Sequence, residues 1–344
     1  MRTVLASIAA ILFVFTTYVV SGSRTEAQEP PAEPSEPFQT WLAKLIDEAG
    51  DRGFSEKLVA QTLYGLEPLP RVIQADRSQA ELTPGLDRYL STRVTPAVVS
   101  RGRELMRQHR TLLDGVEREY KVQRRFVMAI WGMETRYGRV MGSTPVFRAL
   151  ATLAWEPRRA EYFRGELFNA LTIVQRGHID AASMKGSWAG AMGQPQFMPS
   201  SFTRYSVDFD GDGKRDIWSN VPDVLASTAN YLKGFDWQHD ETWGREVRVS
   251  AAARERVREK VPMRKEGCFA IRNMTERRDL DDWAAFGIVR ADGSPLPKAD
   301  VKGSLVITGD NRTFLVYRNY EALLGYNCAH YYALSVAMLA DRLR

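Results

Sequence analysis

One acidic residue, Glu134, interrupts a predicted helix that is otherwise largely apolar. The helix covers residues 124–137, which read RRFVMAIWGMETRY. Ile130 lies four residues before Glu134, so the two share one helix face. Apolar surroundings raise the pKa of a carboxylic acid, and an acid that stays protonated near neutral pH can donate its proton to a leaving-group oxygen. Glu134 is therefore a candidate general acid. The alternative is a structural carboxylate paired with Arg136 or Arg139.

A second group of acids resembles the first half of a calcium-binding loop. Residues 208–216 read DFDGDGKRD, which places acids at positions 1, 3, 5 and 9 and Gly213 at position 6. Carboxylate oxygens at alternate positions and a glycine at the turn are typical of such loops. Position 12 holds Ser219 in place of the usual Glu, and Asp223 is a candidate for a later ligand. The alternative is a solvated acidic turn.

A third candidate is a loop poor in bulky aliphatic residues. Residues 186–200 read GSWAGAMGQPQFMPS. The glycines and prolines predict a tight turn that presents backbone groups, together with Ser187 and Gln196, to a ligand. The alternative is a packed structural turn.

The elements that must position these residues are mostly helices. Apolar residues recur at helical spacing over seven segments: 38–66, 94–120, 124–137, 145–154, 158–176, 222–234 and 329–343. Residues 245–318 instead carry β-branched runs and turn signals, with a hairpin predicted around Gly309-Asp310-Asn311. We therefore predict a mainly α protein with a small β-rich insertion, an α+β fold.

Composition and targeting signals limit the function. Of 344 residues, 44% are hydrophobic and 26% are charged, and 47 basic against 42 acidic residues give a net charge of +5. This balance is typical of a globular protein and too mild for a nucleic-acid binder. Residues 1–27 have the basic start, apolar run and small residues of a secretory signal peptide; the alternative is an uncleaved anchor. Residues 28–37 are proline-rich and predict an extended linker. We expect an exported protein.

The chain has two cysteines, Cys268 and Cys328. In an exported protein, such a pair can form one disulfide, and the alternative is two free buried thiols. Neither cysteine has the spacing of a metal-ligand motif. We expect no organic cofactor.

Several motifs together resemble the bacterial lytic murein transglycosylase B family. They occur in the family's order and are GMETRYGR (132–139), PRRAEYF (157–163), GSWAGAMG (186–193), QFMPS (196–200) and Tyr326-Asn327. The resemblance covers residues 38–344. It implies an N-terminal α domain over 38–123, a lysozyme-like catalytic core over 124–243, a small β-rich domain over 244–318 and a C-terminal helix over 319–344 that returns to the core.

The resemblance also assigns roles to single residues. Glu134 matches the family's catalytic glutamate. Positions lining the sugar cleft match Ser187, Gln196, Tyr326, Asn327, Tyr332 and Tyr89. Arg158 and Arg159 match a basic pair suited to the anionic peptide or lactyl groups. In members that bind calcium, the ligands correspond to Asp208, Asp210, Asp212, the backbone carbonyl of Lys214, and Asp223.

The function implied is cleavage of the bond between N-acetylmuramic acid and N-acetylglucosamine in peptidoglycan, with release of a 1,6-anhydromuramic product. The expected partner is the glycan strand, with cell-wall synthesis proteins as a further class, and the expected setting is a monomer in the periplasm, soluble or anchored to the inner membrane. Two alternatives stay open. A hydrolytic muramidase would need a second carboxylate, for which Glu166, Asp180 and Asp208 are candidates. A non-catalytic wall-binding protein would need no acid at all.

Overall fold

The computed structural model describes residues 33–78 and 85–344. Helices dominate, and one five-stranded sheet lies in the C-terminal third of the chain. The predicted fold class, mainly α with a small β-rich insertion, is confirmed. The predicted signal peptide over 1–27 lies outside the described residues. Within the described ranges, no helix has the length and apolar character that a membrane span requires.

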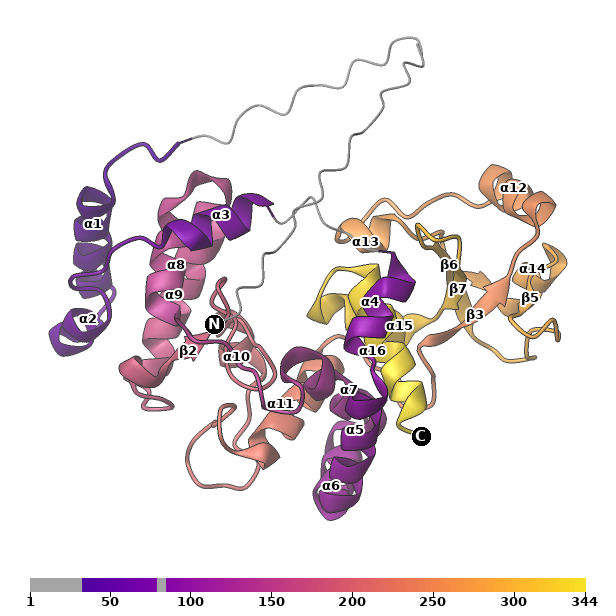
Figure 1. Ribbon diagram of the computed structural model, residues 1–344, viewed down its shortest axis with the longest axis horizontal. Helices are drawn as coiled ribbons and strands as arrows, with labels where there is room; N and C mark the ends of the chain where they lie inside the picture. The colour runs from indigo at the N-terminus through magenta and orange to yellow at the C-terminus, as the bar shows by residue number, and fades with distance from the viewer. Residues whose placement is uncertain (1–32, 79–84) are drawn as a thin grey trace, which may run out of the picture.

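Six helices build a first lobe, on the left of Figure 1. Their buried faces share one hydrophobic cluster that contains Leu45, Val72, Leu150 and Phe163. The six are α1 (Phe38–Asp51), α2 (Glu56–Thr62), α3 (Pro70–Ser78), α8 (Val146–Trp155), α9 (Ala160–Gln175) and α10 (Pro199–Tyr205).

Seven helices build a second lobe around another cluster, which contains Phe126, Leu225 and Tyr320. They are α4 (Leu86–Arg93), α5 (Pro96–Gln108), α6 (Arg110–Tyr120), α7 (Arg124–Thr135), α11 (Val221–Gly234), α15 (Arg318–Tyr326) and α16 (His330–Arg342). The C-terminal α16 packs against both α4 and α7, so the end of the chain returns to helices that precede the sheet (Figure 1).

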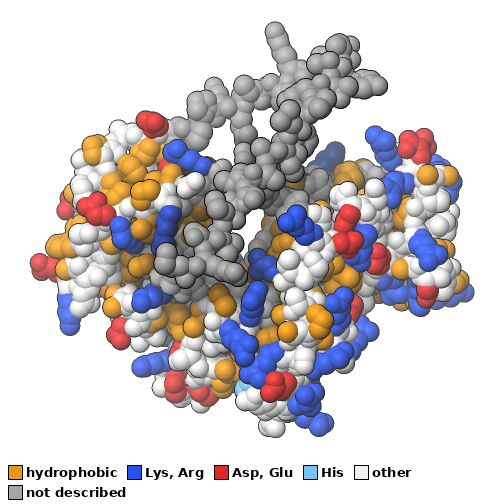
Figure 2. Space-filling view, in the orientation of Figure 1, with side chains coloured by type: hydrophobic (Ala, Val, Ile, Leu, Met, Phe, Trp, Pro, Cys, Tyr) orange, Lys and Arg blue, Asp and Glu red, His pale blue; other side chains and the backbone are white. Residues whose placement is uncertain are grey.

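The two clusters divide the stretch 38–123, because α1 to α3 pack in the first lobe and α4 to α6 in the second. Figure 2 shows the surface hollowed between the lobes, with Lys and Arg side chains along the right-hand edge of the hollow.

The prediction of one continuous helix over 94–120 is wrong. The chain leaves helical geometry at His109, with φ −100° and ψ 24°, and this residue separates α5 from α6. The reason is tertiary: α5 packs on α7, whereas α6 packs mainly on α11 and to a smaller extent on α7. A straight helix cannot follow both neighbours.

The sheet has the strand order β4-β6-β7-β3-β5, with every neighbouring pair antiparallel. The predicted hairpin is present between β6 and β7, where Asn311 adopts the left-handed conformation at φ +62°. The strands are β3 (Gly244–Arg248), β4 (Arg278–Asp279), β5 (Val289–Arg290), β6 (Lys302–Ile307) and β7 (Thr313–Val316). Three helices also lie in this region: α12 (Ala251–Lys260), α13 (Phe269–Arg272) and α14 (Leu280–Ala285).

Short elements complete the first lobe. Strands β1 (Thr144–Pro145) and β2 (Lys185–Gly186) pair antiparallel, and the 3₁₀ turns are η1 (Pro157–Arg159) and η2 (Ala181–Ser183).

A disulfide joins Cys268 to Cys328, with the two Cα atoms 6.3 Å apart. The predicted pairing is therefore confirmed. The bond ties the start of α13, in the β-rich region, to the turn between α15 and α16.

Replacing Cys268 and Cys328 together by serine should lower the free energy of unfolding by up to about 4 kcal/mol, because the bond closes a loop of 60 residues in the unfolded chain. Urea unfolding of the variant and of the oxidised parent measures this difference. Parent protein held in reductant should approach the variant. Superimposable curves for the oxidised parent and the variant would contradict the prediction.

Candidate active site

Helix α7 presents Glu134 from the centre of the second lobe. Every residue from Phe126 to Met133 on this helix is buried. The helix ends because Arg136 adopts the left-handed conformation, at φ 51°. Glu134 therefore sits in the last turn of a helix that packing against α5, α11 and α16 holds rigid, and its side chain stays partly accessible to solvent.

The Glu134 carboxyl has one hydrogen-bond partner that fixes its position. The Tyr332 hydroxyl, from α16, donates to Glu134 Oε1 over 2.6 Å. Burial raises the pKa of Glu134 to about 7, and the Tyr332 hydrogen bond and the charge of Arg93 oppose this shift. Neither Arg136 nor Arg139 contributes to it, so the arrangement is that of an acid kept protonated near neutral pH rather than of a surface ion pair.

Three tyrosines surround this carboxyl. The rings of Tyr326 and Tyr332 stack with centroids 6.3 Å apart and planes 15° apart. The charge of Glu134 raises the pKa of Tyr326, of Tyr332 and of Tyr89, in each case after burial as the larger cause. The structure therefore brings together four of the predicted site residues, from α4, α7, α15 and α16.

Arg93 belongs to the same group, and the sequence analysis missed it. Its guanidinium carbon lies 5.5 Å from the centroid of the Tyr89 ring, one turn earlier on α4. Its positive charge lowers the pKa of Glu134. No local sequence signal marks Arg93, because only the packing of α4 on α16 brings it near α7.

The 186–200 loop supports Ser187 and Gln196 by its own hydrogen bonds. Ser187 Oγ accepts from the backbone N–H groups of Ala189 and Ala191, at 3.3 and 3.1 Å. Gln196 has φ +52°, and its Nε2 donates to the carbonyl oxygens of Met141 and Gly193. The loop is thus held in one shape, and the Ser187 hydroxyl proton stays available as a donor.

Gln194 ties this loop to the helix that carries Glu134, a role that the sequence analysis did not identify. Trp131, on α7, donates its indole N–H to Gln194 Oε1 over 2.8 Å, and Thr135 donates to the Gln194 carbonyl oxygen. Gly138 makes this approach feasible: it has φ +80°, and a Cβ there would lie 2.3 Å from Gln194 Oε1. The Gly-Gln-Pro-Gln stretch was the local sequence signal that could have pointed to Gln194.

Asn327 follows the last turn of α15 and is exposed, next to Tyr326. The Tyr326 hydroxyl donates to the carbonyl oxygen of Pro195 over 2.6 Å, which joins α15 to the 186–200 loop. Tyr326 is therefore in direct contact with the loop that carries Ser187 and Gln196.

The structure gives Arg158 and Arg159 a different partner from the predicted anionic groups. Both guanidiniums form ion pairs with Asp76 on α3, a carboxylate that is 1% exposed. This pairing fastens η1 to α3 within the first lobe and compensates a buried charge.

The acidic loop matches the predicted calcium site in part. Asp208, Asp210 and Asp212 bring carboxylate oxygens within 4.8 Å of one another. Asp223 does not join this group. It is fully buried and accepts from the backbone N–H groups of Phe209 and Asp216, each at 2.7 Å. Burial raises the pKa of Asp223, the two backbone hydrogen bonds oppose that shift, and the neighbouring acids add to it. Three clustered carboxylates fit a hard divalent cation.

This geometry defines a class of site: one protonatable carboxylic acid beside aromatic rings, in a helical protein hollowed between two lobes (Figure 2). Such a site is suited to acid-catalysed cleavage of a sugar polymer. Residues 37–341 match the family described as "Transglycosylase SLT domain", and the chain belongs to that family. The resemblance stated from the motifs is confirmed.

Individual relatives agree with this assignment. The chain is 37% identical over 209 residues to membrane-bound lytic murein transglycosylase B of Escherichia coli, a match that spans 58% of this chain and only 57% of that protein. SltB3 of Pseudomonas aeruginosa, solved in complex with NAG-NAM-pentapeptide, is similar with a TM-score of 0.80 and 39% identity over 89% of this chain and 79% of that one. The calcium complex of Escherichia coli Slt35 has a TM-score of 0.72 and 30% identity, over 88% and 92%.

Replacing Tyr332 by phenylalanine should move the alkaline limb of the pH–activity profile to higher pH. The lost hydrogen bond stabilises the ionised form of Glu134, so its removal raises a pKa that already lies at about 7. Initial rates of wall lysis between pH 5 and pH 9 measure the midpoint of this limb independently of the maximal rate. An unchanged or lowered midpoint would show that Glu134 does not govern the limb.

Proposed function

We propose that the protein is a peptidoglycan lytic transglycosylase. It cleaves the bond between N-acetylmuramic acid and N-acetylglucosamine and leaves 1,6-anhydromuramic ends. The observation that carries this proposal is the partly buried Glu134 carboxyl, which Tyr332 holds by a hydrogen bond of 2.6 Å beside stacked aromatic rings and whose pKa burial raises to about 7. Family membership supports the same activity.

The chemistry needs one carboxyl group used twice. Glu134 first donates its proton to the glycosidic oxygen, the bond from that oxygen to the anomeric carbon breaks, and the N-acetylglucosamine hydroxyl leaves. The Glu134 carboxylate then accepts the proton of the substrate's C6 hydroxyl, whose oxygen bonds to the anomeric carbon. Because the attacking group belongs to the substrate, proximity replaces a positioned water. The 2-acetamido group stabilises the developing positive charge, and Ser187 orients it.

The hydrolytic alternative lacks a suitable second carboxylate among the three candidates. Glu166 is buried and accepts from the backbone N–H and the hydroxyl of Ser200, at 2.8 and 2.6 Å. Asp208 binds the backbone of the acidic loop, and Asp180 is exposed at the start of η2. None of them perturbs the pKa of Glu134. This favours the anhydro-forming reaction, and the presence of the protonatable acid disfavours a non-catalytic wall-binding protein.

The proposed substrate contacts follow from the site's geometry. The stacked rings of Tyr326 and Tyr332, with Tyr89, offer flat apolar faces to sugar rings. Gln196 and the exposed Asn327 offer polar groups. Arg158 and Arg159 stay a prediction for anionic groups of the substrate, with Asp76 as a competing partner.

The setting that fits this activity is the periplasm. We propose that residues 1–27 direct export and that 28–37 form a linker. The boundaries 38–123, 124–243, 244–318 and 319–344 stay a proposal for the order of segments along the chain, whereas in space α1 to α3 and α4 to α6 pack in different lobes. We propose a monomer acting on glycan strands, with cell-wall synthesis proteins as a further class of partner. The disulfide supports an oxidising compartment.

We propose that the acidic loop binds calcium in a structural role. Asp208, Asp210 and Asp212 would supply side-chain oxygens and Lys214 its backbone carbonyl. Asp223 would stabilise the loop backbone instead of binding the ion, because both of its carboxylate oxygens already accept hydrogen bonds from backbone N–H groups. A solved relative is a calcium complex.

Glu134→Gln should abolish wall lysis, because an amide can neither donate a proton to the glycosidic oxygen in the first step nor accept the proton of the C6 hydroxyl in the second. Purified parent and variant are compared by digestion of isolated peptidoglycan and mass spectrometry of the released muropeptides. The parent's products should carry anhydro ends. Reducing ends, which are one water heavier, would overturn the transglycosylase assignment in favour of hydrolysis.

The matched control is Glu161→Gln, the same change at an exposed position of α9. This variant should lyse walls at the parental rate. The Glu134 variant should remain folded, with an unchanged circular dichroism spectrum. If it retained activity within about tenfold of the parent, a residue other than Glu134 would be the acid.

Chelator should lower the melting temperature, and millimolar calcium should restore it by mass action. With three side-chain carboxylates and no bidentate Glu, the dissociation constant should be about 10⁻⁴–10⁻³ M. Magnesium should restore less, because it demands a stricter geometry. The matched control is the double variant Asp208→Asn with Asp210→Asn, whose melting temperature should not change with calcium. A parent protein equally indifferent to calcium would mean that the loop is a solvated turn.

A further inference from the structure

A pocket outside the Glu134 site is lined, among the residues that the structure describes, by three arginines and no acid. It has a volume of about 420 Å³ and lies between α5 and the C-terminal end of α16. Its charged residues are Arg103, Arg107 and Arg342, and its remaining lining is Pro96, Val99 and Ser100. Arg103 and Arg107 are four residues apart on α5, so they project from one helix face.

Backbone contacts hold two of these guanidiniums next to each other. Arg103 Nε donates to the carbonyl oxygen of Arg342 over 2.9 Å. Arg342 Nη1 donates to the carbonyl oxygen of Val94 over 3.1 Å. Neutral carbonyl groups fix these cations without cancelling their charge. The remaining N–H donors of both side chains stay available to a ligand.

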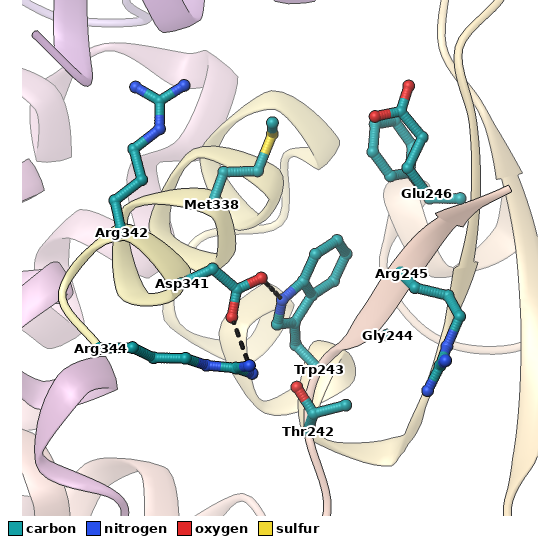
Figure 3. A pocket seen from close by; sticks show the side chains of 10 residues that line it. Thr242, Trp243, Gly244, Arg245, Glu246, Met338, Asp341, Arg342 and Arg344 are labelled. Atoms are coloured by element: carbon teal, nitrogen blue, oxygen red, sulfur yellow. Dashed lines mark hydrogen bonds and ion pairs between the residues drawn. The ribbon is translucent and has the colours of Figure 1, made fainter. Parts of the chain in front are cut away.

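The acids nearest in sequence to these arginines form ion pairs with other residues. Glu104 pairs with Arg101 over 2.8 Å, although Arg107 also lies within electrostatic range of it. Asp341 binds Arg125, Arg344 and the indole N–H of Trp243. Figure 3 shows Arg342 pointing away from this Asp341–Trp243 pair, whereas Arg344 reaches toward it.

A neighbouring pocket differs from this one because acids line it together with arginines. It contains Arg245, Arg342 and Arg344, but also Glu246 and Asp341 (Figure 3). Asp341 forms an ion pair with Arg344, so an acid within that pocket neutralises one of its arginines. In the pocket between α5 and α16, none of the three arginines forms an ion pair with a described acid, and Arg107 interacts at longer range only with Glu104, which is itself paired with Arg101.

We infer that the pocket between α5 and α16 binds a doubly charged tetrahedral oxyanion, a phosphate group. A single carboxylate satisfies one guanidinium bidentately, whereas a phosphate offers three terminal oxygens and two charges to several. The pocket is larger than a free phosphate ion, which suits a phosphate monoester carried by a larger molecule, either a soluble monoester or the headgroup of phosphatidic acid. The site is separate from the proposed glycan chemistry.

Melting of the full chain is measured in inorganic phosphate and in sodium chloride of equal ionic strength, so that general screening cancels. Phosphate at 20 mM should raise the melting temperature of the parent above its value in chloride. Arg107→Gln should weaken the phosphate affinity at least about tenfold, since one charge-assisted hydrogen bond contributes roughly that factor. The matched control is Arg118→Gln on α6, also exposed, which should respond like the parent.

Sedimentation with vesicles then shows whether the bound phosphate group belongs to a lipid or to a soluble molecule. The vesicles contain phosphatidic acid, whose headgroup is a phosphate monoester. Vesicles that bind the parent, but bind Arg103→Gln/Arg107→Gln less, would identify a lipid headgroup; phosphate binding without vesicle binding would identify a soluble monoester. Either result supports the site. The inference is overturned if phosphate and chloride act alike, if Arg107→Gln responds like the parent, or if succinate stabilises as well as phosphate. All of these variants should lyse walls normally, so the Glu134 proposal is tested separately.

Discussion

The structure depends on one constraint: a carboxyl group must be dry enough to hold its proton near neutral pH and still be accessible to a substrate. Helix α7 meets the first requirement by burying nearly its whole length, and Glu134 meets the second by occupying the last turn before the chain departs at Arg136. Tyr332 then fixes the carboxyl by a hydrogen bond of 2.6 Å. Because Tyr332 comes from α16, the end of the chain must fold back onto α7 before the site exists.

The same constraint explains the polar links between the 186–200 loop and the second lobe. Gln194 is 7% exposed, yet its amide oxygen accepts from Trp131 of the second lobe. Its amide nitrogen donates to the carbonyl oxygen of Trp218, which packs against the cluster of the first lobe. Tyr326 adds the hydrogen bond to Pro195. A loop held this way keeps Ser187 at a fixed place relative to Glu134, and in a preorganised site small displacements reduce the rate strongly.

Much of this arrangement could be predicted from the sequence, because its signals are local. The apolar period identified α7 and α16, the Gly-Asp-Asn turn identified the β6–β7 hairpin, and Glu134 stood out as an acid among apolar residues. Helix α12 was missed although Ser250 caps it by accepting from Ala253. Its AAARERVREK sequence has only two buried apolar positions, Ala253 and Val257, so its apolar period is weak beside the β-branched runs that flank it. Three features depend on packing between segments that are distant in the sequence, so no local pattern predicts them. They are the place of Arg93 beside Glu134, the pairing of Arg158 with Asp76, and the break at His109.

The buried acid also has a thermodynamic consequence for the whole fold. An unfolded glutamate titrates near 4.5, whereas Glu134 in the folded protein titrates at about 7, so the folded state binds the proton more tightly. The free energy of unfolding therefore falls as pH rises between these two values. At 1.36 kcal/mol per pKa unit the loss is at most about 3 kcal/mol, and it is smaller because the side chain keeps some contact with solvent. The apolar packing of α7 both raises the pKa of Glu134 and stabilises the second lobe, and the Cys268–Cys328 bond and the Asp76 ion pairs stabilise other parts of the fold. The stability lost at Glu134 is thus offset partly by the same buried helix that makes its carboxyl a usable acid.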